Sequence, residues 1–272
     1  YMASGQSARQ SAATVIPGAL RLGAIILAGL LHAPLTMEAW AGWYLGASAL
    51  SAVLCLGLVV RDHGWPRAAW IPGLWGEGLT FAAESALQAS VKDLDKPIVL
   101  QFLGPEAAGL YAAAFRVVDV VTLPMKALGY ALYARMFKLA AESIEACRAL
   151  ARRMAALAAG IGAAGGLGLV AFAWLLPIVF GGAYAELPWL VRLLAPMPAL
   201  FGAYVVGADL LSATGRQSHR LGVVVVSLAL TLGLCWVATP ILGLEGAVLA
   251  RLAVYALCTV LVWVLAMRGG TR

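Results

Sequence analysis

Four charged residues lie close together in the middle of an otherwise apolar stretch. Lys92, Asp93, Asp95 and Lys96 fall within one short run, and Pro97 follows them directly. A charged side chain at the centre of a bilayer costs at least about 2.5–3.5 kcal/mol, so charged residues at that depth usually face a protein interior or a water-filled cavity. The cluster therefore indicates a path for something polar rather than a lipid-facing anchor.

Helical periodicity places part of this cluster on one face. At about 100° per residue, Glu84, Lys92 and Asp95 fall on the same side of a helix. Lys92 and Asp95 have the i,i+3 spacing at which side chains interact along a helix. Asp93 points to the opposite side and needs another partner, and Pro97 favours a kink just after the cluster.

Other apolar segments carry charged residues of the same kind, namely Arg116, Asp119, Arg192, Asp209 and Arg251. Arg116 and Asp119 can pair along one face of a helix. The run Ala195-Pro196-Met197-Pro198 lies between Arg192 and Asp209 and predicts a helix break near mid-membrane. Broken helices at membrane depth are tolerated where they line a cavity, and they are common at transporter sites.

These charges allow two explanations. The cations Lys92, Lys96, Arg116, Arg192 and Arg251 are matched by the acids Glu84, Asp93, Asp95, Asp119 and Asp209. In the first explanation they only neutralise one another in a static bundle. An ion pair inside a protein, however, rarely contributes more stability than apolar packing. We therefore favour the second explanation, in which the charged side chains line a polar translocation cavity.

Catalytic and metal-binding patterns are absent from the sequence. There is no HExxH motif, no Ser/His/Asp set at one membrane face and no large soluble loop to hold a donor substrate. The four cysteines form no CxxC pair and have no histidine at a ligand-like spacing. We expect no enzymatic activity, no metal and no cofactor. The net charge of +6 comes from short clusters between apolar segments, so it indicates membrane topology rather than nucleic-acid binding.

Composition predicts an all-α, multi-pass membrane protein. The chain has 272 residues, of which 62% are hydrophobic and only 12% are charged, whereas soluble domains are about a quarter charged. A helix needs about 20 apolar residues to cross a bilayer. The segments that meet this length are 12–33, 40–60, 77–103, 108–133, 155–179, 187–213, 220–239 and 244–266. We therefore expect about eight transmembrane helices.

Loop charges predict the orientation of these segments. The loops after the odd-numbered segments are acidic and hold no Lys or Arg, whereas those after the even-numbered segments are basic. By the positive-inside rule the basic loops are cytoplasmic, and both chain ends lie on that side too. The long connection 134–153 alternates apolar and charged residues. It is either an amphipathic helix along the cytoplasmic interface or a solvated linker helix.

The residues around the charged cluster resemble a known family. Asp95-Lys96-Pro97 precedes the turn from Leu103-Gly104 to Gly109-Leu110-Tyr111, and Arg116 and Pro124 follow. This order resembles the seventh and eighth helices of the polysaccharide exporters. These are lipid-linked oligosaccharide flippases of the multidrug/oligosaccharidyl-lipid/polysaccharide (MOP) superfamily, related to multidrug and toxin extrusion transporters. Two further stretches look like motifs of the family: Gly243-Leu244-Glu245-Gly246-Ala247 and Ala213-Thr214-Gly215-Arg216.

The resemblance implies a division of the chain into two parts. Family members have twelve or more spans in two lobes. Residues 1–70 would then be the last two helices of an N-terminal lobe, and 71–272 a complete six-helix C-terminal lobe. The chain also begins abruptly before a hydrophobic segment, so we expect it to be truncated at its N-terminus.

The resemblance also implies a substrate and a mechanism. Undecaprenyl-pyrophosphate-linked oligosaccharide would be flipped from the cytoplasmic to the periplasmic leaflet of a bacterial inner membrane, for O-antigen, capsule or exopolysaccharide synthesis. The lobes would rock about a central cavity, with a polysaccharide polymerase and glycosyltransferases as further partners. The expected substrate-binding residues are Lys92, Lys96, Arg116, Arg192 and Arg251. The acids expected to position them or to couple transport to ions are Glu84, Asp95, Asp119 and Asp209.

Two alternative functions stay open. The first is a cation-coupled multidrug exporter of the related branch, with Glu84 and Asp95 as the ion-linked carboxylates. Lys92 and Lys96 argue against it, because they would repel a cationic drug. The second is a membrane scaffold or inactive fragment that transports nothing.

Overall fold

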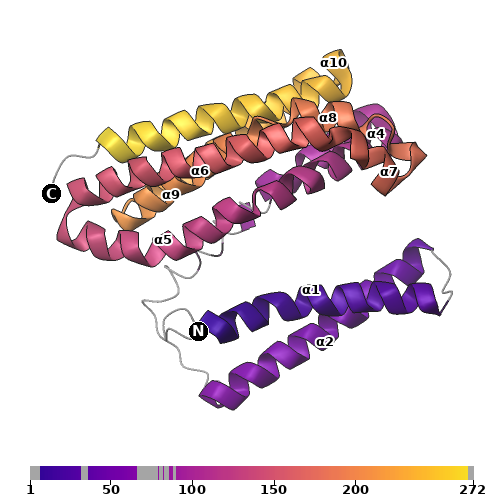
Figure 1. Ribbon diagram of the computed structural model, residues 1–272, viewed down its shortest axis with the longest axis horizontal. Coiled ribbons are helices and arrows are strands. Elements are labelled where there is room, and N and C mark those ends of the chain that lie inside the picture. Colours follow the sequence, from indigo (N-terminus) through magenta and orange to yellow (C-terminus); the bar gives the residue numbers. More distant parts are fainter. Residues whose placement is uncertain are drawn as a thin grey trace. The chain divides into compact units, whose positions relative to one another are not determined.

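The chain is all-α wherever its structure is described. The computed structural model describes residues 7–31, 36–65, 79, 82, 86, 87 and 90–268, and every regular element among them is helical (Figure 1). The chain divides into two compact units, Tyr1–Pro72 and Gly73–Arg272. The all-α fold class is thereby confirmed. The boundary lies beside the expected one at residue 70, while the assignment of the units to two lobes stays a prediction.

The first unit is a pair of helices, α1 (Ser7–Leu30) and α2 (Met37–His63). Helix α2 begins where the Thr36 side chain accepts a hydrogen bond from the backbone N–H of Ala39 at 3.3 Å, a typical N-cap. The two helices lie side by side, and the guanidinium of Arg21 stacks over the ring of Tyr44 at 4.6 Å. Both predicted segments in this unit are therefore helical.

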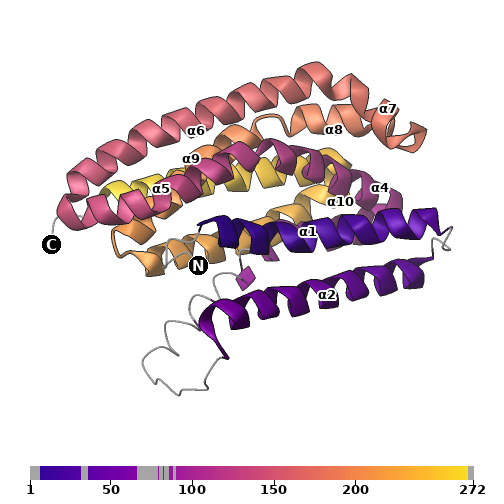
Figure 2. The ribbon, with the colours of Figure 1, turned by 60° about the horizontal axis from the view of Figure 1, so that its bottom comes forward.

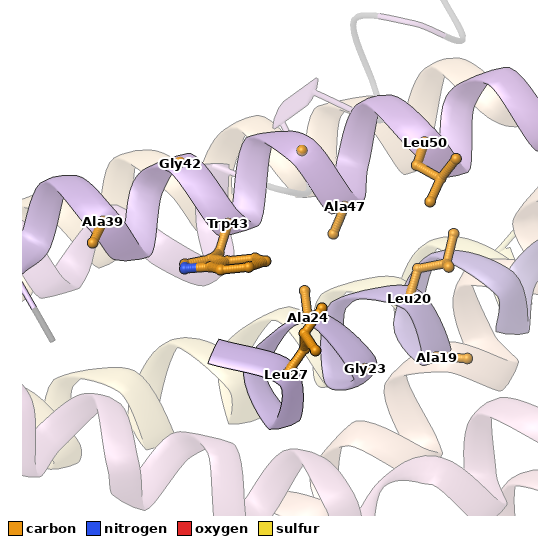
Figure 3. A pocket seen from close by; sticks show the side chains of 11 residues that line it. Ala19, Leu20, Gly23, Ala24, Leu27, Ala39, Gly42, Trp43, Ala47 and Leu50 are labelled. Atoms are coloured by element: carbon orange, nitrogen blue, oxygen red, sulfur yellow. The ribbon is translucent and has the colours of Figure 1, made fainter. Parts of the chain in front are cut away.

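A cavity separates the middle parts of α1 and α2 (Figure 3). Its volume is about 670 Å³, and Gly23, Gly42, Trp43 and Gly46 are among its lining residues. A Cβ atom added at Gly42 or Gly46 would meet no atom within 4 Å. The small residues that line this cavity therefore border open space rather than a close backbone contact.

The second unit contains the remaining described helices. They are α4 (Asp95–Val121), α5 (Leu123–Glu142), α6 (Ile144–Phe172), α7 (Leu176–Phe180), α8 (Leu187–Leu193), α9 (Met197–Ala213) and α10 (Gln217–Arg268), with short 3₁₀ turns at Ala173–Leu175 and Gly182–Tyr184. Helix α6 packs along α9, which packs in turn along α10 (Figures 1 and 2). The two larger apolar clusters of the core lie at the α5–α6–α9–α10 contacts and around α4 and α8, and a smaller one lies between α4 and α10.

Helices α4 and α10 each reverse direction at a glycine. Gly104 has φ 84° and ψ 177°, and Gly243 has φ 63° and ψ −142°, conformations that side-chain-bearing residues rarely adopt. At 1.5 Å per residue, α10 would be about 78 Å long if straight, more than twice the thickness of a hydrocarbon core. It therefore forms two arms, which correspond to the predicted segments 220–239 and 244–266.

Several described helices are long and apolar enough to cross a membrane. Within the described residues they are Glu38–Asp62, Ser90–Val121, Ile144–Phe180 and Gln217–Arg268. The helices Gly182–Leu193 and Met197–Ala213 add a fifth span if they count as one, bent by 52°. This bend confirms the predicted break at Pro196 and Pro198. The predicted total of eight spans and the cytoplasmic position of both ends stay predictions.

The segment 134–153 does not form a helix of its own. Helix α5 continues to Glu142 and α6 begins at Ile144. Ser143 separates them in an extended conformation, with φ −155° and ψ 116°, and its side chain accepts a hydrogen bond from the N–H of Ala146 at 3.2 Å. A single capping serine thus converts the predicted amphipathic helix into the joined ends of two helices. Whether these ends lie at the cytoplasmic interface stays a prediction.

The contact between α6 and the broken helix α8–α9 depends on glycine. A Cβ added at Gly162 would overlap the carbonyl of Pro198, and one at Gly166 would overlap the carbonyl of Ala195. These carbonyls belong to the break itself, where the helical hydrogen-bond ladder is interrupted. Gly162 and Gly166 thus permit the close packing that positions the break against α6.

Candidate functional site

A buried polar cluster joins three helical arms of the second unit. Asp95, Tyr111 and Arg251 have exposed fractions of 0%, 0% and 1%. The Tyr111 hydroxyl donates a hydrogen bond to Oδ2 of Asp95 at 2.8 Å, and Nη1 of Arg251 lies 3.7 Å from the same oxygen. Arg251 also donates to the backbone carbonyl of Val91. The cluster therefore links both arms of α4 to the second arm of α10.

The turns of the chain explain how these residues meet. The reversal at Gly104 folds the second arm of α4 back, so that Tyr111 comes to lie opposite Asp95. The reversal at Gly243 folds the second arm of α10 back along the first, and this second arm carries Arg251. The guanidinium of Arg251 also lies over two aromatic rings, 5.3 Å from the centroid of Tyr255 and 5.9 Å from that of Phe115.

Not every polar atom in the cluster is satisfied. Oδ1 of Asp95 and Nε of Arg251 are buried without a hydrogen-bond partner among the described residues. Such an arrangement is a weak source of stability, because desolvating both charges offsets most of their attraction. Loss of a single partner would nevertheless be costly, since it would leave one buried charge uncompensated.

The structure corrects the expected partners of the central charged cluster. Asp95 pairs with Arg251 and not with Lys92, which is exposed. Asp93, which needed another partner, forms an ion pair with Lys96 at the surface of the unit. Helical periodicity did not reveal these partners, because the donors to Asp95 come from Tyr111 and Arg251, which other helical arms bring into the core.

The acid on the second arm of α4 also has a different partner. Asp119 lies 3.7 Å from the ammonium of Lys126, which in turn lies 5.5 Å from the ring centroid of Phe201. Arg116 is exposed and forms no ion pair with another described residue. The expected pair of Arg116 with Asp119 is therefore wrong, because Lys126 lies about two helical turns after Asp119 on the same face and reaches its carboxylate instead.

Lys92 and Arg116 lie at the same level of the α4 hairpin. Each is twelve positions from Gly104 in the sequence, one before it and one after it. At about 1.5 Å per residue both lie roughly 18 Å from the turn. The hydrogen bond between Tyr111 and Asp95 shows that the two arms run side by side. The hairpin thus presents two exposed cations at one depth.

The two charged residues around the helix break do not meet. Arg192 lies in the last turn of α8 and is exposed. Asp209 is buried near the other end of α9, where Oδ1 lies 3.8 Å from Nη1 of Arg220 at the start of α10. Nη1 of Arg220 also donates to the hydroxyl of Ser212 at 2.7 Å. Asp209 therefore helps to hold α9 against α10.

The predicted site residues thus fall into three groups. Lys92, Arg116 and Arg192 are exposed, Lys96 and Asp119 are paired at the surface, and Asp95, Asp209 and Arg251 are buried in ion pairs. Glu84 lies outside the described residues. Across the described parts of both units, no group of three or more potential ligands could hold a metal ion.

Sequence reasoning missed the role of Tyr111 and of Arg220. Tyr111 was noted only as part of a motif, and Arg220 only as a loop cation. Tyr111 contacts Asp95, which is sixteen positions away in the sequence, and Arg220 contacts Asp209, which lies on another helix. The isolated buried acids in otherwise apolar segments were the available signal, because each requires a donor from a neighbouring helix.

Comparisons with known proteins identify the fold. No protein-family model and no curated protein matches the chain. Among solved structures, the chain is similar to the outward-facing conformation of a multidrug resistance MATE family transporter of the MOP superfamily. The TM-score is 0.71 at 15% identity, and the match covers 93% of this chain.

The chain therefore has the fold of a helical membrane transporter. It spans 60% of the length of the transporter that it matches. This likeness agrees with the fold expected from the sequence and does not distinguish between a polysaccharide and a multidrug transporter.

Proposed function

We propose that the protein is a membrane transporter that flips undecaprenyl-pyrophosphate-linked oligosaccharide between leaflets by alternating access. The transporter fold supports the general activity. The substrate is inferred from the resemblance around Asp95 and Tyr111 and from the exposed cations of the second unit. A bacterial inner membrane is the site at which such a lipid would be handled.

The observation that carries the proposal is the pair of exposed cations at one level of the α4 hairpin. Lys92 and Arg116 lie roughly 18 Å from the turn at Gly104. With this turn at a membrane surface, they would lie near the middle of a hydrocarbon core about 30 Å thick. An unpaired cation facing lipid at that depth would cost at least about 2.5–3.5 kcal/mol, so the two cations suit a wet cavity that accepts an anion.

A pyrophosphate is a suitable ligand for these side chains. The planar guanidinium of Arg116 can donate two parallel hydrogen bonds to phosphate oxygens, and the ammonium of Lys92 acts as a compact point charge. Arg192 is a further exposed cation in the second unit. Lys96 is less available, because Asp93 already pairs with it.

The buried cluster would serve a different purpose in the transport cycle. Arg251 is only 1% exposed, so a head group cannot reach it in this conformation. Its contacts with Asp95 and with the Val91 carbonyl instead hold the start of α4 against α10, and the hydrogen bond from Tyr111 to Asp95 joins the second arm of α4 to the first. The six-helix unit could then move as one body while the cavity opens to either side.

A second candidate is a multidrug exporter, which is the class named for the solved structure to which the chain is similar. In that case buried carboxylates such as Asp95 would couple drug export to ions. The exposed cations Lys92 and Arg116 argue against a cationic drug, because they would repel it. Drug resistance that disappears in a D95N variant but survives in R116A would support this candidate.

The polysaccharide function can be tested in cells that depend on the full-length protein. We expect K92A and R116A to abolish surface polysaccharide while the protein is still made and inserted. The matched control is R268A, which removes an exposed cation from the last turn of α10. Normal polysaccharide in both K92A and R116A would contradict the proposal.

A further inference from the structure

The ends of α5 and α6 form an antiparallel hairpin with Ser143 at its tip (Figures 1 and 2). The thiol of Cys147 donates a hydrogen bond to the carbonyl of Met136 at 3.5 Å, so the two helices are in contact just behind the tip. Met136, Cys147 and Ala151 are buried in the core of the unit. The hairpin is therefore a fixed part of the unit, and its outer face has a defined chemistry.

Exposed cations gather on this hairpin at similar distances from the tip. Arg135 and Lys138 come from α5, and Arg152 and Arg153 come from α6; these four exposed residues are here called the basic band. At about 1.5 Å per residue they lie roughly 8–15 Å from Ser143. Helices that run in opposite directions thus bring cations that are apart in sequence to the same level.

The other exposed residues of the hairpin follow an order along its axis. Glu142 and Glu145 lie at the tip, in front of the basic band. Behind it lie exposed aromatic and aliphatic side chains, with Tyr130 at 73% and Leu157 at 48% exposure. Both are roughly 20 Å from Ser143. Phe137, at 40% exposure, lies among the cations. From tip to base, the hairpin is therefore acidic, then basic with one aromatic ring in the band, then aromatic and apolar.

This order matches the layers of a membrane interface. Acids belong in water, cations at the level of anionic head groups, aromatic rings at the interfacial boundary and aliphatic side chains in hydrocarbon. A soluble partner would not require aromatic and apolar residues directly behind the cations. A nucleic acid would not require such residues either, and the acids at the tip would repel it.

We propose that the basic band binds the head groups of anionic phospholipids on the cytoplasmic surface of the membrane. Arg135 and Arg152 would contact phosphate oxygens, with Lys138 and Arg153 adding attraction. Each cation close to an anionic surface strengthens lipid binding about fivefold. A band of four exposed cations therefore selects anionic over zwitterionic lipid, and it orients this end of the unit at the head-group level.

The proposal can be tested with full-length protein reconstituted into phosphatidylcholine mixed with phosphatidylglycerol. Native mass spectrometry of the purified protein counts the lipids of each class that it retains. We expect the wild type to enrich phosphatidylglycerol and the double variant R135Q/R152Q to lose about thirtyfold in this preference, at about fivefold for each cation. The variant R135K/R152K should keep most of it, since the charge remains.

The matched control removes the same number of charges from the tip of the same hairpin. E142Q/E145Q neutralises two exposed acids beside the basic band and should leave the preference unchanged or raise it. Size-exclusion chromatography and thermal unfolding verify that each variant is folded. Equal retention of the two lipids by the wild type would overturn the proposal. An equal loss in R135Q/R152Q and E142Q/E145Q would also overturn it, because the loss would then not depend on the cations.

Discussion

At the scale of single residues, the partner of Asp95 decides how the central charges are interpreted. From the sequence, Asp95 shares a helical face with Lys92, and the pair reads as part of one site. In the structure the carboxylate is turned inward to Tyr111 and Arg251, while Lys92 remains exposed. A cluster that is continuous in sequence is thus divided between a structural contact and an exposed surface.

The buried pair leads to a prediction for protein stability. R251M leaves Asp95 charged and uncompensated in the core, so it should lower the free energy of unfolding by about 3–5 kcal/mol. The apolar variant D95L/Y111F/R251M removes all three polar groups and should recover most of the loss. Thermal unfolding of the purified full-length protein measures both effects.

An exposed pair provides the control for this stability measurement. K96M breaks the surface pair with Asp93 and should cost no more than about 1 kcal/mol. If R251M were as mild as K96M, or if the apolar variant were the least stable of the three, the Asp95–Arg251 contact would not have the role assigned to it.

Residue-level sequence reasoning predicted burial for some of the acids and was unreliable for pairing. Asp95 and Asp209 are buried with a donor, whereas Asp93 and Asp119 pair at the surface. The donors, Arg251 and Arg220, come from other helices. Which helices are neighbours depends on tertiary packing, so helical periodicity along one segment cannot identify them.

At the scale of helices, glycines fix both the turns and the closest contacts. Gly104 and Gly243 reverse α4 and α10, while Gly162 and Gly166 accept the carbonyls of the broken helix α8–α9. The break and the Gly162–Gly166 contact could be predicted, because proline interrupts a helix and glycine admits a neighbouring backbone. The predicted helix at 134–153 failed, because periodicity does not reveal the single capping residue Ser143.

The α6 contact gives a prediction with a control on the same helix. A Cβ at Gly166 would overlap the backbone carbonyl of Ala195, so G166A should cost about 1–3 kcal/mol of stability. Gly168 has open space around it, so G168A should be neutral or stabilise the helix by up to about 1 kcal/mol. Thermal unfolding compares the two. Equal stability of both variants would show that α6 does not approach the break so closely.

At the scale of the whole molecule, composition alone was enough to predict an all-α membrane protein. Large apolar side chains on the outside of the second unit agree with it, among them Leu167, Val179 and Ile241, each more than 70% exposed. The sequence could not give the substrate, because oligosaccharide binding is distributed over many weak contacts. The exposed cations of the α4 hairpin restrict the class of substrate, since they favour an anionic group such as pyrophosphate.

The central claim is that the exposed cations Lys92 and Arg116 carry the head group of a lipid-linked oligosaccharide across the membrane. The direct measurement is the transfer of undecaprenyl-pyrophosphate-linked oligosaccharide between leaflets of proteoliposomes that contain the full-length protein. We predict rapid transfer by the wild type and by R268A, and a loss of transfer in K92A/R116A. Transfer by the double variant at the wild-type rate, or none by the wild type, would contradict the account.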